Sequence, residues 1–118
     1  MIAEVQQENR INLDEFRTAG VIVFSGRPKG VALRRKLQLD KKDADQSQVT
    51  IVVPNEVVSL NSSFFLGLFA DSVTALGRDR FEQKYVFECP IEIREDIEDG
   101  IRQALDESNP IPDRTGTR

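Results

Sequence analysis

Two neighbouring serines stand where a helix is predicted to begin. Ser62 and Ser63 follow Asn61, after an apolar, strand-like stretch and a short loop, and they precede a helical pattern of apolar residues. A hydroxyl at a helix N-terminus lies in the positive end of the helix dipole, where a phosphate is stabilised. Ser62 and Ser63 are therefore phospho-acceptor candidates. The alternative is that Asn61 or Ser62 caps the helix, which contributes about 1 kcal/mol and is compatible with phosphorylation.

A second candidate site is the glycine-flanked turn at residues 25–30, Ser-Gly-Arg-Pro-Lys-Gly, which leads into another helical pattern. Arg27 and Lys29 lie in this turn, and Arg34 follows on the predicted helix beside two further cations. A helix N-terminus with cations around it favours a phosphate, a nucleotide or an acidic partner. The turn lacks the glycine spacing and Lys-Ser/Thr pair of a Walker A motif. The alternative is a solvated basic helix face.

A thiol is the third group with possible chemistry. Cys89 follows a predicted strand, and Arg94 lies five positions further on. A thiol enzyme would require a low thiol pKa and an anion-cradling loop, but Pro90 and Glu92 disfavour such a loop. A buried, inert thiol is the favoured interpretation.

Composition restricts the remaining chemistry. The 118-residue chain contains no histidine, which removes the commonest general base, the Ser-His and Cys-His pairs and most zinc sites. Asp40, Asp43 and Asp45 suggest calcium, but they lack the glycine and glutamate of an EF-hand loop. We therefore expect no catalytic residue, no metal and no cofactor, and a protein that is not an enzyme.

Charge and hydropathy indicate a class of protein and a compartment. The net charge of -4 argues against nucleic-acid binding, and a single cysteine fits a reducing compartment. No stretch reaches the roughly 18 apolar residues of a membrane span, and the first residues lack the layout of a signal peptide. We expect a cytoplasmic protein that does not bind membranes.

Three phenylalanines follow the serine turn. Phe64, Phe65 and Phe69 lie at helical spacing without interleaved cations, so core packing is favoured over a base-stacking platform. Phe64 is expected to be exposed at the turn and to contact a partner together with Asn61, Ser62 and Ser63.

Hydrophobic periodicity predicts the elements that position these residues. Strands are predicted at residues 21–24, 49–53 and 84–89. Helices are predicted at 28–39, at 64–76 with Gly77 as the C-cap, and around 93–105. Residues 40–48 are predicted to form a solvated loop.

The order of these elements predicts a single small α/β domain with a mainly parallel sheet and helices packed on it. The strand at 49–53 is almost wholly apolar, which is typical of a strand covered on both faces. The serine turn would then lie at the carboxyl end of a central strand. The domain is predicted at residues 11–108, between a flexible or edge-strand N-terminus (1–10) and a disordered tail (109–118).

The serine turn and the order of elements resemble the STAS fold of anti-sigma factor antagonists, and more closely the STAS-like domain family of unknown function. Ser-Leu-Asn-Ser-Ser-Phe at residues 59–64 is a typical core of that family, and the resemblance runs from Val21 to Leu105. The antagonists carry Asp-Ser-Ser/Thr-Gly at this turn, so Asn61 and Phe64 depart from their pattern. The resemblance implies phosphorylation of Ser62 by an anti-sigma-type kinase.

The leading hypothesis from the sequence is a non-enzymatic regulatory domain of STAS-like type, which binds a protein partner and is controlled by phosphorylation at the serine turn. By resemblance, the partner would be a histidine-kinase-like ATPase. The alternative is a module that binds a phosphate or nucleotide ligand at residues 25–30. The sequence also leaves open the alternative that the chain forms a homo-oligomer.

Overall fold

The computed structural model describes residues 9–108. The short strands and their neighbouring 3-10 helix are β1 (Arg10–Asn12), η1 (Leu13–Phe16), β2 (Val23–Phe24), β3 (Val49–Val52), β4 (Ser59–Leu60) and β5 (Tyr85–Glu88). The α-helices are α2 (Arg27–Leu37), α3 (Leu39–Ala44), α4 (Ser62–Lys84) and α5 (Ile91–Ser108). The expected disordered tail and most of the expected N-terminal segment lie outside the described residues.

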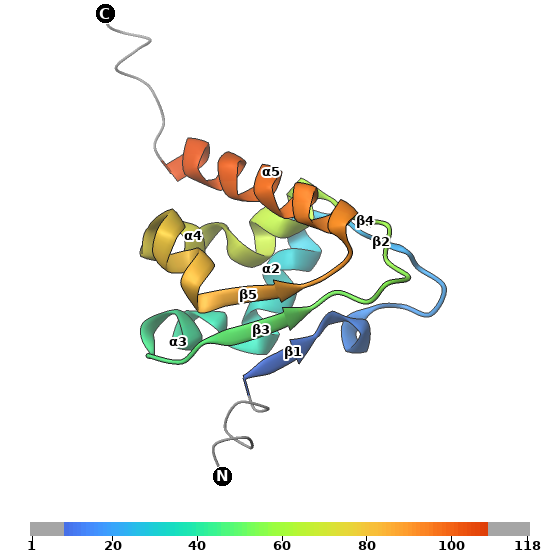
Figure 1. Ribbon diagram of the computed structural model, residues 1–118, viewed down its shortest axis with the longest axis horizontal. Helices are drawn as coiled ribbons and strands as arrows, with labels where there is room; N and C mark the ends of the chain where they lie inside the picture. The colour runs from blue at the N-terminus through green and yellow to red at the C-terminus, as the bar shows by residue number, and fades with distance from the viewer. Residues whose placement is uncertain (1–8, 109–118) are drawn as a thin grey trace, which may run out of the picture.

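The main sheet is parallel, with β3 between β1 and β5 (Figure 1). A smaller parallel pair joins β2 to β4, with Val23 opposite Ser59 and Phe24 opposite Leu60. Helices pack on the main sheet, and the whole forms a single small mixed α/β domain. The predicted fold class is confirmed.

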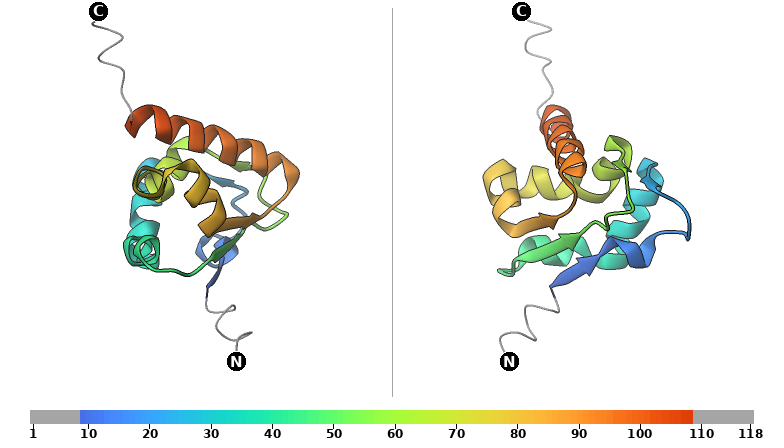
Figure 2. Two further views of the ribbon diagram at one scale, coloured as in Figure 1. Left: turned by 60° about the vertical axis from the view of Figure 1, so that its left-hand side comes forward. Right: turned by 45° about the vertical axis from the view of Figure 1, so that its right-hand side comes forward.

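The main sheet has one buried face within the described residues. Val49 and Ile51 of β3 are buried, whereas Thr50 and Val52 between them are half-buried. The same alternation in β5 exposes Val86. Figure 2 shows α2, α3 and α4 gathered on one side of the sheet. The prediction of a strand covered on both faces is therefore wrong, because the apolar run does not by itself distinguish one covered face from two.

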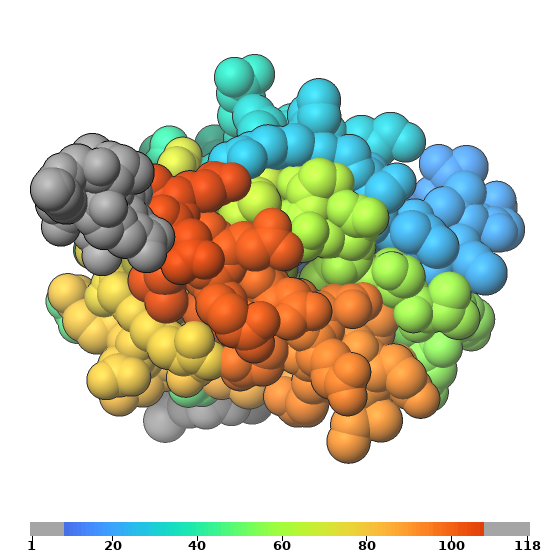
Figure 3. Space-filling view, turned by 90° about the horizontal axis from the view of Figure 1, so that it is seen from above, coloured from blue at the N-terminus to red at the C-terminus, as the bar shows by residue number. Residues whose placement is uncertain are grey.

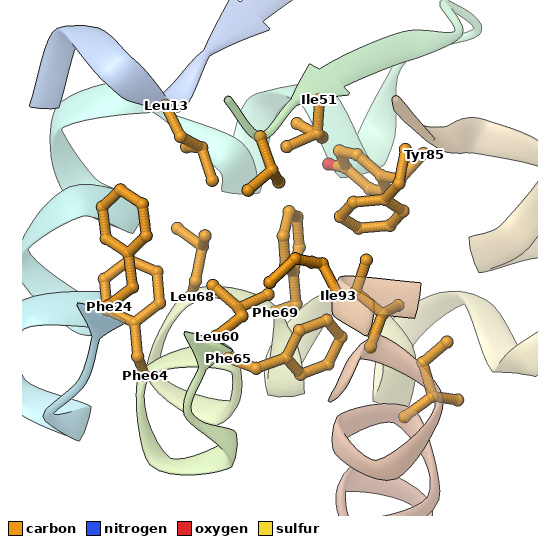
Figure 4. Packing of buried hydrophobic residues seen from close by; sticks show 14 of the residues in the cluster. Leu13, Phe24, Ile51, Leu60, Phe64, Phe65, Leu68, Phe69, Tyr85 and Ile93 are labelled. Carbon is orange, nitrogen blue, oxygen red and sulfur yellow. The ribbon is translucent and has the colours of Figure 1, made fainter. Parts of the chain in front are cut away.

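Aromatic rings fill the space between the main sheet and α4 (Figure 4). Phe69 lies at the centre, with ring centroids 5.1 Å from Tyr85 and 5.3 Å from Phe65. Phe64 stacks on Phe24 at 5.0 Å and is only 3% exposed. Core packing of these phenylalanines is confirmed, but the expected exposure of Phe64 is wrong because β2 supplies a ring that covers it.

Gly77 divides α4 into two helical segments. Its φ of +80° is a conformation that glycine adopts at little cost, so the first segment ends there as predicted. The helix resumes and continues to Lys84, because Phe81 in the second segment is fully buried among the aromatic rings. The sequence interpretation missed this second segment.

Two further boundaries differ from prediction. Most of α3 lies within the loop expected at 40–48, and its first residue, Leu39, is completely buried and holds the short helix against the core. The strand expected at 21–24 contracts to Val23–Phe24 and pairs with β4 instead of joining the main sheet.

The final helix, α5, packs mainly on α4 and β4 rather than on the main sheet.

Candidate functional site

Two glycines bring the beginnings of α2 and α4 together. A Cβ atom on Gly30 would lie 2.3 Å from the carbonyl oxygen of Phe64, and one on Gly67 would lie 2.2 Å from that of Arg27. Only glycine permits so close a backbone approach. Figure 3 shows the yellow-green start of α4 at the surface, between the sky-blue start of α2 and the orange α5.

The serine turn, residues 61–63, lies at this meeting point. Asn61 Oδ1 accepts hydrogen bonds from the Ser63 backbone N–H at 2.9 Å and from Ser63 Oγ at 2.7 Å. Ser63 Oγ also accepts from the Gly26 N–H at 3.3 Å, which ties the turn to α2. Of the two residues that the sequence offered as the N-cap, Asn61 and Ser62, the structure shows that Asn61 caps α4.

Ser62 differs from its neighbours in the turn. It is half-buried, and its hydroxyl has no hydrogen-bond partner among residues 9–108. It is the first residue of α4, where backbone N–H groups lack helical partners and the dipole is positive. Its hydroxyl therefore takes no part in the hydrogen bonds that hold the turn within the described residues.

The strand before the turn is held by a residue that sequence reasoning missed. Asp96 on α5 accepts a hydrogen bond from the Leu60 backbone N–H at 2.8 Å. This carboxylate accepts the bond from the backbone N–H of the last residue of β4, and it fixes the position of the chain just before Asn61. The sequence offered no signal for it, because Asp96 is one of several acids near the start of α5.

The turn follows β4, not the central strand β3 directly. Six residues separate β3 from β4, and β4 pairs with β2 outside the main sheet. The prediction that the turn lies at the carboxyl end of a central strand is therefore wrong. It lies at the carboxyl ends of the β2–β4 pair.

Exposed apolar side chains surround this smaller pair. Val21, Ile22 and Val23 are 43%, 47% and 39% exposed, and Val58 is 57% exposed. The Val58 N–H donates to the Ile22 carbonyl at 2.9 Å, so the two segments lie side by side. We call Val21, Ile22, Val23 and Val58 the β2 patch. The exposed apolar side chains near the turn are therefore those of the β2 patch, and Phe64 is not among them.

The three anion-binding candidates do not form one site. Arg27 pairs with Glu107 of α5 at 3.0 Å, and this hydrogen bond raises the Arg27 pKa. Lys29 is exposed and has no ion-pair partner among the described residues. Arg34 is 7% exposed and lies away from the turn. The prediction that it lies on a solvated basic face is wrong, because Arg34 is buried and pairs with Asp40 and Asp43 of α3.

Arg34 is the centre of a polar cluster. It donates to Asp40 Oδ1 and Asp43 Oδ2, at 2.7 Å each, and to Ser72 Oγ at 2.8 Å. The Tyr85 hydroxyl donates to Asp43 at 2.5 Å. Burial, and then this bond to Asp43, raise the Tyr85 pKa far above its ordinary value. We call Arg34, Asp40, Asp43, Ser72 and Tyr85 the Arg34 cluster.

The acids considered for calcium are occupied by protein groups. Asp40 and Asp43 pair with Arg34, and Asp45 accepts from Ser47 and from Lys84 Nζ. Hydrogen bonds from Ser47 and Lys84 lower the Asp45 pKa to about 2. Within residues 9–108, no cluster of acids, cysteines or histidines has the geometry to hold a metal ion.

Cys89 is partly buried beside β5. Burial raises the pKa of its thiol, against a smaller opposing effect of Arg94, whose guanidinium donates to the Phe87 carbonyl at 2.9 Å. A thiol enzyme needs the opposite shift. The geometry therefore favours the inert thiol.

No family model, curated protein or solved structure matches this chain at a significant level. In the described part of the chain, every helix is too short or too polar to cross a lipid bilayer.

Proposed function

We propose that this chain is a non-enzymatic, cytoplasmic regulatory domain of STAS-like type that binds a protein partner through the serine turn and the adjoining β2 patch. Phosphorylation of Ser62 controls that binding. By resemblance, the partner is a kinase of the anti-sigma, histidine-kinase-like ATPase type. The observation that carries the proposal is the Ser62 hydroxyl at the start of α4, which has no hydrogen-bond partner in the described part of the chain.

The hydrogen bonds of the turn separate the two serine candidates. Ser63 Oγ bonds to Asn61 and to the Gly26 N–H, so its phosphorylation would break contacts that hold α2 to α4. Ser62 makes no such contact among the described residues. Ser62 is thus the acceptor whose modification changes the surface without disturbing the fold.

A phosphate on Ser62 would change the surface electrostatically. It adds nearly two negative charges at neutral pH and three strong acceptor oxygens. The dipole of α4 stabilises these charges in the free protein. In a complex, the same charges must be desolvated against the partner, because exposed apolar side chains lie beside the turn. Phosphorylation therefore weakens docking more than it affects folding.

Phosphorylation is tested by mapping the modified residue. Wild type, Ser62→Ala and Ser63→Ala are incubated with labelled ATP and a lysate of the cells that make the protein, and phosphopeptides are identified by mass spectrometry. We expect phosphate on Ser62 in wild type and in Ser63→Ala, and none on this turn in Ser62→Ala. An unmodified turn in all three proteins would contradict the regulatory proposal.

Partner switching is tested by affinity capture with wild type and Ser62→Glu. We expect a kinase-like ATPase to be retained by wild type and lost by Ser62→Glu. Ser62→Ala serves as the matched control, because it removes the hydroxyl without adding charge, and it should retain the partner. A complex that survives Ser62→Glu unchanged would contradict the mechanism.

A phosphate or nucleotide ligand at residues 25–30 is the second candidate function. It is favoured by Lys29, which has no ion-pair partner within residues 9–108, and by the start of α2, where Gly26 supplies no side-chain cap. Arg34 takes no part in it. Calorimetric titration with ATP, GTP and inorganic phosphate tests this candidate, and Lys29→Ala should weaken any binding that is found.

A further inference from the structure

A groove of about 500 Å³ runs along α2 on the side of η1 and β2. One wall is a single face of α2, formed by Lys29, Ala32, Leu33 and Lys36 at helical spacing. The segment from Glu15 to Thr18 forms a second wall, the η1 wall, and Val21, Val23, Phe24, Ser25 and Phe64 complete the lining. The exposed Val21 and Val23 belong both to the lining of the groove and to the β2 patch.

The lining of the groove is mixed, with apolar side chains beside charged ones. Phe16, Phe24, Leu33 and Phe64 contribute rings and an aliphatic side chain. Val23 adds an exposed apolar edge. A groove of this lining suits large apolar side chains of a ligand.

The rim is positively charged on a protein that is acidic overall. Arg17, Lys29 and Lys36 line the groove against a single carboxylate, Glu15, although the chain carries a net charge of -4. Arg17 is committed to Asp14. Lys36 Nζ lies 5.5 Å from the Phe16 ring centroid and, like Lys29, has no carboxylate partner among the described residues. Two cations on the rim are therefore available to a ligand.

We propose that this groove binds an acidic, apolar-bearing peptide segment of the protein partner. This deepens the proposed function and rests on it for the existence of a partner. The apolar side chains of the segment enter between α2 and the η1 wall, while its carboxylates pair with Lys29 and Lys36.

The lysine spacing sets the pattern of the ligand. Lys29 and Lys36 are separated by two turns of α2, about 10 Å along the helix axis. A helical ligand lying along α2 would match them with acids seven positions apart. An extended ligand would match them with acids three positions apart, since each residue advances about 3.3 Å.

The groove ends beside the serine turn. Ser25 lines it, and the next residue, Gly26, donates its N–H to Ser63 Oγ. Phosphate on Ser62 would add negative charge near the end of a groove that selects an acidic ligand. Repulsion of the bound segment then adds to the desolvation cost of docking.

The test begins with selection of random short peptides displayed on phage against the immobilised wild-type chain. The most enriched peptide is synthesised with a fluorescent label, and its Kd is measured by anisotropy. Lys29→Glu/Lys36→Glu reverses the groove charge, and Arg35→Glu/Lys41→Glu makes the same charge change at exposed positions outside the groove. Circular dichroism verifies that both variants fold.

We expect enriched peptides that combine acids with large apolar residues. Reversal at Lys29 and Lys36 should weaken binding at least roughly tenfold, and the control by less than about twofold. Failure to enrich any peptide, enrichment without acidic bias, or equal loss in both variants would overturn the proposal. A concentration-dependent dimer in sedimentation that Val23→Ser dissociates would also overturn it, because a second copy would then fill the groove.

The effect of Ser62→Glu on the same peptide keeps the two proposals distinguishable. Weaker binding to Ser62→Glu supports both. Equal binding to wild type and Ser62→Glu, with charge-dependent binding retained, would contradict control by Ser62 and still support the groove.

Discussion

The same two helices, α2 and α4, place polar residues in two different environments. Further along the helices, Arg34 of α2 and Ser72 of α4 are buried and bond to each other and to Asp43. Near the starts of the helices, Lys29 of α2 and Ser62 of α4 reach the surface without partners among residues 9–108.

This difference separates polar groups that hold the fold together from polar groups that are open to a binding partner. Within the described residues, no buried side-chain nitrogen or oxygen lacks a hydrogen-bond partner, so the Arg34 cluster leaves nothing for a ligand to satisfy. Around the serine turn, the Ser62 hydroxyl and the Lys29 cation have no partner within residues 9–108, and the β2 patch is exposed. The cluster should therefore govern stability, and the turn should govern binding.

The largest expected effect is on the cluster. Asp43→Ala removes a carboxylate that is 9% exposed and leaves the Arg34 charge buried, which should lower the free energy of unfolding by about 3–5 kcal/mol. Asp40 pairs with the same arginine, but its side chain is 87% exposed. Asp40→Ala should therefore lower the free energy of unfolding by less than about 1 kcal/mol.

Urea unfolding followed by circular dichroism measures both variants. If Asp43→Ala does not fold, Asp43→Asn keeps the shape of the side chain and permits the comparison. Similar losses for Asp40→Ala and Asp43→Asn would contradict the claim that burial decides the effect.

Tyr85 gives the next largest effect. Tyr85→Phe removes a hydrogen bond to a charged group and should lower the free energy of unfolding by about 1.5–3 kcal/mol. Because burial and the Asp43 hydrogen bond raise the pKa of Tyr85 in the folded state, its contribution is complete below the unfolded pKa near 10. It is lost as the pH rises above that value.

Tyr85 is the one tyrosine of the chain, so tyrosinate absorbance reports on it alone. We expect no tyrosinate in the folded protein and its appearance only together with loss of the circular dichroism signal. The chain in urea should titrate at the ordinary value. Ionisation of Tyr85 in a protein that stays folded would contradict its placement in the cluster.

The sequence predicted the architecture well where patterns are local. The parallel α/β fold, Gly77 as an interruption and the core roles of Phe65 and Phe69 all follow from periodicity and glycine chemistry. The placement of Arg34 could not be predicted in this way. Its exposure depends on α3, a short helix in a polar stretch that only tertiary packing of Leu39 stabilises.

In the candidate site too, the features that depend on local sequence could be predicted, and those that depend on tertiary contacts could not. A cap at Asn61 or Ser62 follows from local chemistry, and the structure shows that Asn61 is the cap. The burial of Phe64 and the exposure of Val23 depend on the β2–β4 pairing, which brings together residues about 36 positions apart. The groove depends on how the fold places η1 relative to α2, and no local pattern specifies that placement.

Asn61→Ala should have a smaller effect than the cluster variants. It removes an N-cap that satisfies the Ser63 N–H and should lower the free energy of unfolding by about 1 kcal/mol. Asn61→Asp restores the acceptor and adds a charge that the dipole favours, so it should recover that loss. Both values come from urea unfolding. A loss from Asn61→Ala that Asn61→Asp does not recover would contradict the capping role.

Ser62 gives the smallest expected effect on stability, and this small effect is the strongest contrast with Asp43. Ser62→Ala removes a hydroxyl without a partner among the described residues and should change the free energy of unfolding by less than about 0.5 kcal/mol. Ser62→Glu places a carboxylate in the first turn of α4 and should stabilise by about 0.3–1 kcal/mol at low salt. High salt should reduce this gain. If Ser62→Ala destabilises as much as Asn61→Ala, then Ser62 holds the turn together, and its modification could not act on binding without acting on the fold.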